Sequence, residues 1–199
     1  MWRDVAETFS AKRDGAGTNA NDVETISYIK LIASDENLFD ILFRSYILFD
    51  TSSVGDGAII SSAVFSGYYN TKANGLGTPS LHLASSTPAS NTALVPADYQ
   101  QIGRTSFGSI TYASFTINQY NDITLNANGI NNINKTGISK FSLQLGWDID
   151  NSFTGTWTAF ANSAMNIYSA EQTDTSQDPK LVVTYTVPAS PKQDVIWFD

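Results

Sequence analysis

Apolar and polar residues alternate with a period of two through much of this sequence, a pattern that predicts β-strands. The clearest case is Lys140–Ile149, in which every second residue from Phe141 onward is bulky and apolar. In Ile60–Tyr68 bulky and small residues alternate, and the phase changes near Ser61–Ser62, which predicts a β-bulge. Ser45–Asp50 differs because its apolar residues are almost continuous, a pattern typical of a central strand covered on both faces.

Shorter segments with the same character complete the predicted fold. Further strands are predicted at Asp4–Phe9, Val23–Ile32, Ser80–Ser85, Ser106–Ile117, Asn121–Asn126, Met165–Ala170 and Lys180–Val187. Pro96–Tyr99 and Ala127–Asn134 suit short helical turns. About ten short antiparallel strands with one or two short helical turns predict an all-β fold, a jelly-roll β-sandwich. We expect one domain over residues 1–187, followed by a proline-containing C-terminal tail, 188–199.

Composition narrows the possible partners. A chain of 199 residues with 42% hydrophobic content is long enough to bury a sizeable core. Its net charge of -8 disfavours nucleic acid and anionic lipid, which both attract basic surfaces. The absence of cysteine removes disulfides and thiolate ligands. Because no apolar run is long enough for a signal peptide or a membrane span, we expect no membrane association.

Candidate catalytic and metal-binding groups are sparse. His82 is the only histidine, and its place between two leucines favours a strand face over a catalytic role, so we expect no enzymatic activity. Asp148 and Asp150 sit at the end of the cleanest strand, where carboxylates two residues apart would point the same way. They are candidates for a calcium site completed by backbone carbonyls, the alternative being a solvated strand end. No other cofactor is expected.

Two sets of aromatic and apolar residues are candidates for binding. Trp157, Tyr68 and Tyr69 could stack on sugar rings, with Trp157 flanked by small and polar residues. Val195, Ile196, Trp197 and Phe198 form an apolar segment inside the C-terminal tail. Such a segment suits strand addition to a neighbouring subunit or insertion into its groove, the alternative being that it folds back on its own sandwich.

Three blocks of sequence resemble a known family. Arg44–Asp50 running into Ala58–Phe65, Ile167–Glu171 and Pro179–Tyr185 are similar to DNRLRE and carbohydrate-binding-module-96-like domains. The resemblance implies a jelly-roll sandwich of a kind found in secreted bacterial and archaeal proteins and in phage-like sequences. Thr87–Gly103 and Ser106–Phe115 resemble a variant, common in environmental and viral sequences, that lacks the family's usual tryptophan-containing central segment. We interpret Arg44 and Asp50 as rim residues that satisfy strand ends.

These observations favour a non-enzymatic structural or attachment protein. We expect a subunit of a virion, such as a phage capsid decoration, tail or fibre component, or of another extracellular assembly. Its partners would be other protein subunits, in a homo-oligomer or a larger assembly located at the virion surface or outside the cell. The alternative is a carbohydrate-binding module of a secreted bacterial protein, with a cell-surface glycan as its ligand.

Overall fold

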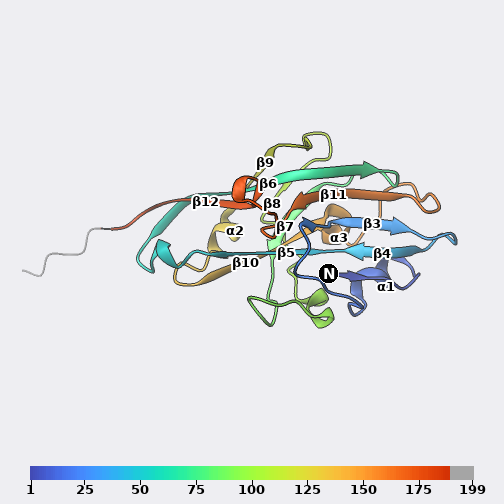
Figure 1. Ribbon diagram of the computed structural model, residues 1–199, viewed down its shortest axis with the longest axis horizontal. Coiled ribbons are helices and arrows are strands. Elements are labelled where there is room, and N and C mark those ends of the chain that lie inside the picture. The colour runs from blue at the N-terminus through green and yellow to red at the C-terminus, as the bar shows by residue number, and fades with distance from the viewer. Residues whose placement is uncertain (189–199) are drawn as a thin grey trace, which may run out of the picture.

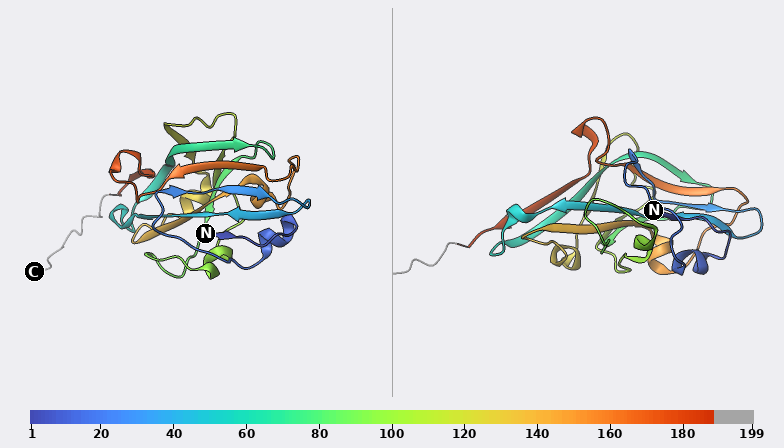
Figure 2. Two further views of the ribbon diagram at one scale, coloured as in Figure 1. Left: turned by 45° about the vertical axis from the view of Figure 1, so that its right-hand side comes forward. Right: turned by 60° about the horizontal axis from the view of Figure 1, so that its bottom comes forward.

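A computed structural model describes residues 1–188, which form two curled antiparallel sheets packed face to face (Figures 1 and 2). The predicted all-β sandwich with short helical turns is confirmed. The predicted subunit contact, Val195–Phe198, lies outside the described residues.

The larger sheet has the strand order β1-β4-β3-β11-β6-β12, with β2 also pairing with β11 and β9 with β6. Its strands are β1 (Trp2–Arg3), β2 (Ile26–Ser27), β3 (Lys30–Ala33), β4 (Phe39–Phe43), β6 (Ile59–Asn74), β9 (Tyr120–Thr124), β11 (Asn162–Tyr168) and β12 (Lys180–Thr186). The smaller sheet has the order β5-β10-β7-β8, with β5 (Ser45–Asp50), β7 (Leu81–Ser85), β8 (Gly108–Ile110) and β10 (Ile138–Leu145). The helices are short: α1 (Phe9–Asp14), α2 (Ala127–Asn131), α3 (Gly146–Asp150), and the 3-10 turns η1 (Ser52–Val54), η2 (Pro96–Gln100) and η3 (Thr175–Gln177).

The core lies between the two sheets, and β6 contributes to it as its alternation predicts. Ala63, Phe65, Gly67 and Tyr69 are buried, whereas Val64, Ser66 and Tyr68, which alternate with them, are only partly buried. Phe49 of β5 packs edge-on against Phe65 across the interface between the sheets, at 6.4 Å between ring centroids. The predicted bulge is confirmed, because the register of β12 on β6 passes from Ser62 to Ile60 and leaves Ser61 out.

Two predicted strands are wrong where helices form. In place of a strand over Asp4–Phe9, helix α1 begins at Phe9, because the Thr8 hydroxyl accepts a hydrogen bond from the Ala11 N–H and caps the first turn. The strand predicted over Lys140–Ile149 ends at Leu145, and α3 follows. Trp147 therefore reaches the core from a helical turn, where period-two alternation has no structural meaning.

Other boundaries and one strand order also differ from the expectation. Only Gly108–Ile110 of the strand predicted over Ser106–Ile117 forms, and β4 was not foreseen as a separate strand. Ser45–Asp50 is not a central strand: among the described residues, β5 pairs with β10 alone and forms the edge of the smaller sheet. The continuous apolar run therefore marks burial of both faces of β5 but not a second neighbouring strand.

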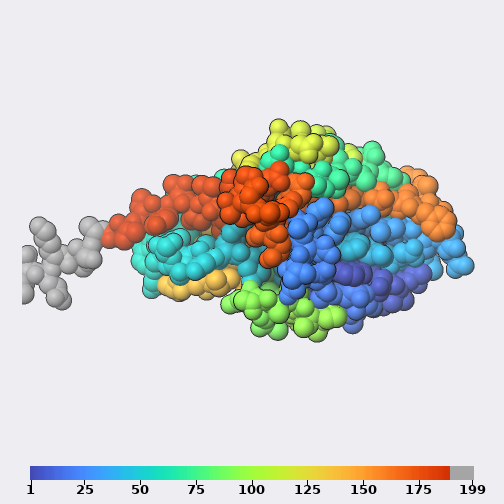
Figure 3. Space-filling model, viewed as in Figure 1, coloured from blue at the N-terminus to red at the C-terminus, as the bar shows by residue number. Residues whose placement is uncertain are grey.

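One end of the elongated molecule is built from the start of β6, the turn before it, and β12 (Figure 3). We call β12 with Ile59–Val64 and Val187 the apolar arm. Ile59 is 62% exposed and Val187 67%, and Val182 and Tyr185 are also exposed. Within residues 1–188, β12 pairs with β6 on one side only, so the arm presents both apolar side chains and an open strand edge.

Candidate binding groove

A groove of about 390 Å³ opens where the two sheets part, and we take it as the candidate site. Its walls come from residues 1–2, the loop and strand at 21–28, β5, the loop 90–94 and the segments 169–171 and 178–179. In Figure 3 it lies at the centre of the face shown, where the blue N-terminal, green and orange segments meet. We call it the strand-edge groove.

The groove exists because the chain changes sheets between β4 and β5. β4 pairs with β3 up to Phe43, and Arg44 then directs the chain into the smaller sheet. β2 pairs with β11, as β3 does, but on its other side, where β4 has left the sheet, it has no neighbour among residues 1–188. One wall of the groove is β5 and the other contains β2. The Ser45 hydroxyl donates to the Tyr28 carbonyl at 2.8 Å and so joins the two walls where β5 begins.

Among residues 1–188, both walls present backbone groups that have no backbone partner. Ile29 and Thr25 accept hydrogen bonds from β11, so the backbone groups of Ile26 point the other way, toward the groove. On β5, Thr51 donates to Gly137 beside β10, whereas Arg44 exchanges backbone hydrogen bonds with Met1 on the opposite side.

The same alternation decides which groups of β5 face the groove. Because Arg44 bonds outward to Met1, the N–H and C=O groups of Tyr46 and Leu48 also point outward. They have no backbone partner within the described part of the chain. Strand edges of this kind accept an additional strand.

The side chains that line the groove are aromatic and acidic. The rings of Trp2 and Tyr28 both lie against Phe43, at 5.4 and 5.5 Å between centroids. Carboxylates of Asp22, Glu24, Glu171 and Asp178 line the outer parts. The groove can therefore hold an extended segment with apolar side chains and free backbone groups, and its rings and carboxylates also suit a sugar.

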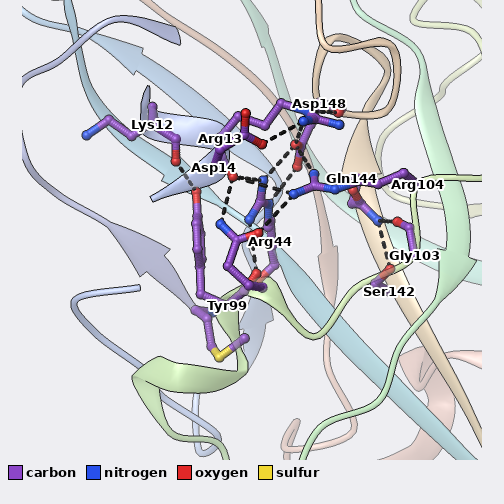
Figure 4. A network of polar contacts seen from close by, with 12 residues as sticks. Lys12, Arg13, Asp14, Arg44, Tyr99, Gly103, Arg104, Ser142, Gln144 and Asp148 are labelled. Atoms are coloured by element: carbon purple, nitrogen blue, oxygen red, sulfur yellow. Dashed lines mark hydrogen bonds and ion pairs between the residues drawn. The ribbon is translucent and has the colours of Figure 1, made fainter. Parts of the chain in front are cut away.

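A buried ionic network fixes the start of β5 (Figure 4). Arg44 and Asp148 are both fully buried, and the guanidinium donates two hydrogen bonds of 2.7 Å to the carboxylate. Arg104 donates to the same carboxylate at 2.6 Å. Arg44 also donates to the carbonyl of Tyr99 and lies over the Tyr99 ring at 4.0 Å. The interpretation of Arg44 as a rim residue is therefore wrong, whereas Asp50 is exposed and accepts from the Ser52 N–H at the strand end.

The electrostatics of this network follow from its burial. Burial alone would lower the pKa of Arg44, but the Asp148 carboxylate outweighs it and raises that pKa above its usual value. Burial lowers the pKa of Arg104, partly against the attraction of the same carboxylate. Burial also raises the pKa of Tyr46, whose hydroxyl donates to the carbonyl of Asp98. The start of β5 is thus held by charges and hydrogen bonds that solvent does not reach.

The predicted calcium pair is not brought together. Its premise, a strand through residue 149, is wrong, because both aspartates lie in α3. Asp148 is committed to its arginine partners, whereas Asp150 lines a separate hollow of about 170 Å³. Among residues 1–188, no three His, Asp or Glu side chains are grouped so that they could hold a metal ion.

The aromatic residues predicted to bind sugars lie in three different environments. Trp157 is half-buried against the core, and its indole N–H donates to the Leu38 carbonyl at 2.9 Å. Tyr69 is fully buried and packs against Phe115 at 3.9 Å between ring centroids. Tyr68 lies on the outer face of β6, half-buried between Tyr120 and Tyr168. The structure does not bring the three together.

His82 lies on β7, as its sequence context predicts, with both ring nitrogens engaged. Nε2 lies 2.7 Å from the Ser80 hydroxyl and Nδ1 2.8 Å from that of Ser106. Burial lowers the pKa of His82, against a smaller opposing effect of Asp150. These contacts satisfy a partly buried imidazole between neighbouring loops.

Sequence analysis did not find the groove. Ile26 and Tyr28 belong to a segment whose alternation indicated only a strand, and Trp2 precedes the first predicted strand. The one available signal was the unbroken apolar run of Ser45–Asp50, which pointed to a strand with neighbours on both sides.

Comparison with known proteins adds no family to this description. No protein-family model matches the chain, and no curated protein matches it. Within residues 1–188, every helix is too short or too polar to cross a lipid bilayer.

Proposed function

We propose that this protein is a non-enzymatic structural or attachment subunit of a virion, such as a phage capsid decoration, tail or fibre component, or of another extracellular assembly. The apolar arm carries this proposal. It exposes Ile59, Val182 and Val187 beside an open strand edge, at the end of the molecule from which the tail continues. Exposed apolar side chains next to an unpaired edge favour association with another chain.

The state of the polar groups supports a role without catalysis. The most deeply buried carboxylate, Asp148, is held by arginines and has no access to a substrate. His82 is held between two serine hydroxyls. Of these groups, the Ser80–His82 pair comes nearest to a nucleophile and base. A hydrolytic activity of the purified chain that disappears in Ser80→Ala would therefore refute the non-enzymatic assignment.

The resemblance described above supports the location. Arg44–Asp50 and Pro179–Tyr185 resemble strands of domains from secreted and phage-like proteins. A sandwich that needs no disulfide and has a large apolar core is stable without a particular redox environment.

The test is the assembly state of the full chain. We expect sedimentation velocity and electron microscopy to show oligomers or filaments that grow with concentration. The double variant Val182→Lys, Tyr185→Lys places charge on the apolar arm and should weaken assembly. Ala113→Lys with Gln119→Lys, which adds the same two charges at exposed loop positions away from the arm, is the matched control. A chain that stays monomeric at every accessible concentration would refute the proposal.

Carbohydrate binding is the second candidate, and the lining of the groove favours it. Aromatic rings can stack on a sugar and carboxylates can accept hydrogen bonds from its hydroxyl groups. On the groove wall the rings of Tyr28 and Trp2 both contact Phe43. Glycan-array binding by a monomeric chain, lost in Tyr28→Ala but kept in Trp157→Ala, would favour this alternative over the structural role.

A further inference from the structure

β5 has the sequence of a central strand but the position of an edge strand. Its residues Tyr46–Phe49 are all apolar, and they are only partly exposed or buried. Ile47 and Phe49 face the core, whereas the Tyr46 hydroxyl bonds to the loop that covers the other face. Both faces are therefore covered, and only the backbone edge toward the groove is open. A strand in the groove would give β5 the second neighbour that its sequence predicts.

A strand in this position would find backbone partners. The outward groups of Tyr46 and Leu48 on β5 and of Ile26 on β2 line the same groove. β1 already pairs with β4, and Met1 bonds to Arg44 just before β5 begins. The incoming strand would lie beside β5 in the same position that β1 occupies beside β4. Main-chain hydrogen bonds would supply affinity, and Trp2, Tyr28 and Phe43 would contact its side chains.

We propose that the strand-edge groove is filled by Val195–Phe198 of a second copy of this chain, added as a strand beside β5. This inference rests on the proposed structural function and names the partner of its assembly. The four residues Val195–Phe198 are all apolar, which suits a strand with both faces covered. A strand lying between β5 and the aromatic wall of the groove would be covered in this way. The donor segment is part of the chain itself, so no other protein is required.

The length of the chain limits how far a copy can fill its own groove. β12 starts beside the groove, which Pro179 lines, and runs away from it to the end of the molecule (Figure 1). From Pro179 to Pro188 the extended chain covers about 30 Å. The link from Pro188 to Val195 spans at most about 25 Å even when fully extended. Val195 therefore falls short of the Pro179 end of its own groove, whereas the groove of a neighbouring copy is not subject to this limit.

The resulting contact is head-to-tail. One copy contributes the segment and the other the groove, so each copy keeps a free donor and a free acceptor. Repetition of such a heterologous contact gives a ring if the rotation closes and an open filament if it does not.

Complementary variants of the full chain test this arrangement. Ile196→Asp with Trp197→Asp removes the donor, and Ala93→Trp with Ala170→Trp fills the acceptor from exposed rim positions. Each variant alone should self-associate at least about 30-fold more weakly than the unmodified chain. An equimolar mixture should form dimers and nothing larger, because one intact donor meets one intact acceptor. Ala97→Trp, at an exposed alanine outside the groove, should assemble normally.

A backbone measurement separates strand addition from side-chain contact. Hydrogen exchange at the Tyr46 and Leu48 amides of the donor-removed copy, whose groove is occupied in the mixed dimer, should slow at least about tenfold relative to the same variant alone. Circular dichroism and thermal melts of each variant verify that it is folded.

Three other results are possible, and each contradicts one of the claims above. If the unmodified chain assembles but either variant assembles equally well, or the mixture stays monomeric, the groove–segment contact is wrong while the structural function stands. If the two amides exchange as fast in the dimer as in the monomer, strand addition is wrong. If the unmodified chain never assembles, the proposed function itself fails.

Discussion

The Arg44–Asp148 pair allows the most demanding test of how this fold is held together. Both side chains are fully buried, and they come from residues far apart in the sequence. Removing one partner of a buried pair leaves an uncompensated charge, which costs about 3–5 kcal/mol. We expect Asp148→Asn to lie near the upper limit, because Arg44 and its neighbour Arg104 would then have no counter-ion. Arg44→Met should lie near the lower limit, because Arg104 still donates to Asp148 at 2.6 Å.

The double variant separates charge burial from packing. Arg44→Met with Asp148→Asn leaves no unpaired buried charge between the two positions, so its loss should fall short of the sum of the single losses by about 2 kcal/mol. Urea unfolding gives the free energies, and a loss of 4 kcal/mol corresponds to a melting temperature lower by about 8–16 °C in a chain of this size.

A surface pair of similar length serves as the control. Arg13 and Asp14 are 2.6 Å apart, but Asp14 is 52% exposed. Asp14→Asn should therefore cost less than about 0.5 kcal/mol. Single losses below about 1 kcal/mol at Arg44 and Asp148, or strictly additive losses, would refute the reasoning.

Three further predictions concern buried groups and close backbone contacts. Tyr69→Phe should raise the free energy of unfolding by about 1 kcal/mol, because the Tyr69 hydroxyl is buried without a partner among residues 1–188. Tyr99→Phe should lower it by a similar amount, because it removes a hydrogen bond to the Lys12 carbonyl; equal effects in urea melts would contradict both. Because burial lowers the pKa of His82 below 6.5, its contribution to stability is complete above pH 6.5 and is lost as the pH falls toward the folded-state pKa. His82→Gln should flatten this part of the pH profile, and an unchanged slope would exclude His82 as its source. Gly155→Ala should lower the free energy of unfolding by at least about 2 kcal/mol, because a Cβ there would collide with the Leu76 carbonyl oxygen. Gly57→Ala is the control: its Cβ would meet no atom within 4 Å, so it should change the free energy of unfolding by less than about 0.5 kcal/mol.

The sequence alone determined the fold class and the local form of its best-patterned strand. In β6, alternation from Ala63 onward tells which side chains face the core, and the phase change near Ser61–Ser62 locates the bulge. These features depend on the period of two and on side-chain size, both of which are local properties. The continuous apolar run of β5 likewise correctly indicated that both of its faces are covered.

Tertiary structure alone decided what lies beside each strand. The pattern of apolar residues in a sequence indicates whether the faces of a strand are covered. Main-chain hydrogen bonds at the edges of the strand involve no side chain, so the sequence pattern does not indicate whether a neighbouring strand is present. β5 was therefore expected at the centre of a sheet and lies at an edge, and the groove between its edge and Ile26 was not foreseen.

The sequence did not predict the buried ionic network, for a related reason. Arg44 and Asp148 each look like ordinary polar residues at the end of a strand, and only the tertiary fold, which places α3 beside Arg44, brings the two charges together. Burial of a charge depends on a partner supplied from elsewhere in the chain, because an unpaired charge would stay in water. Pairing of this kind is a property of the assembled fold, whereas strand patterning is already present in each segment.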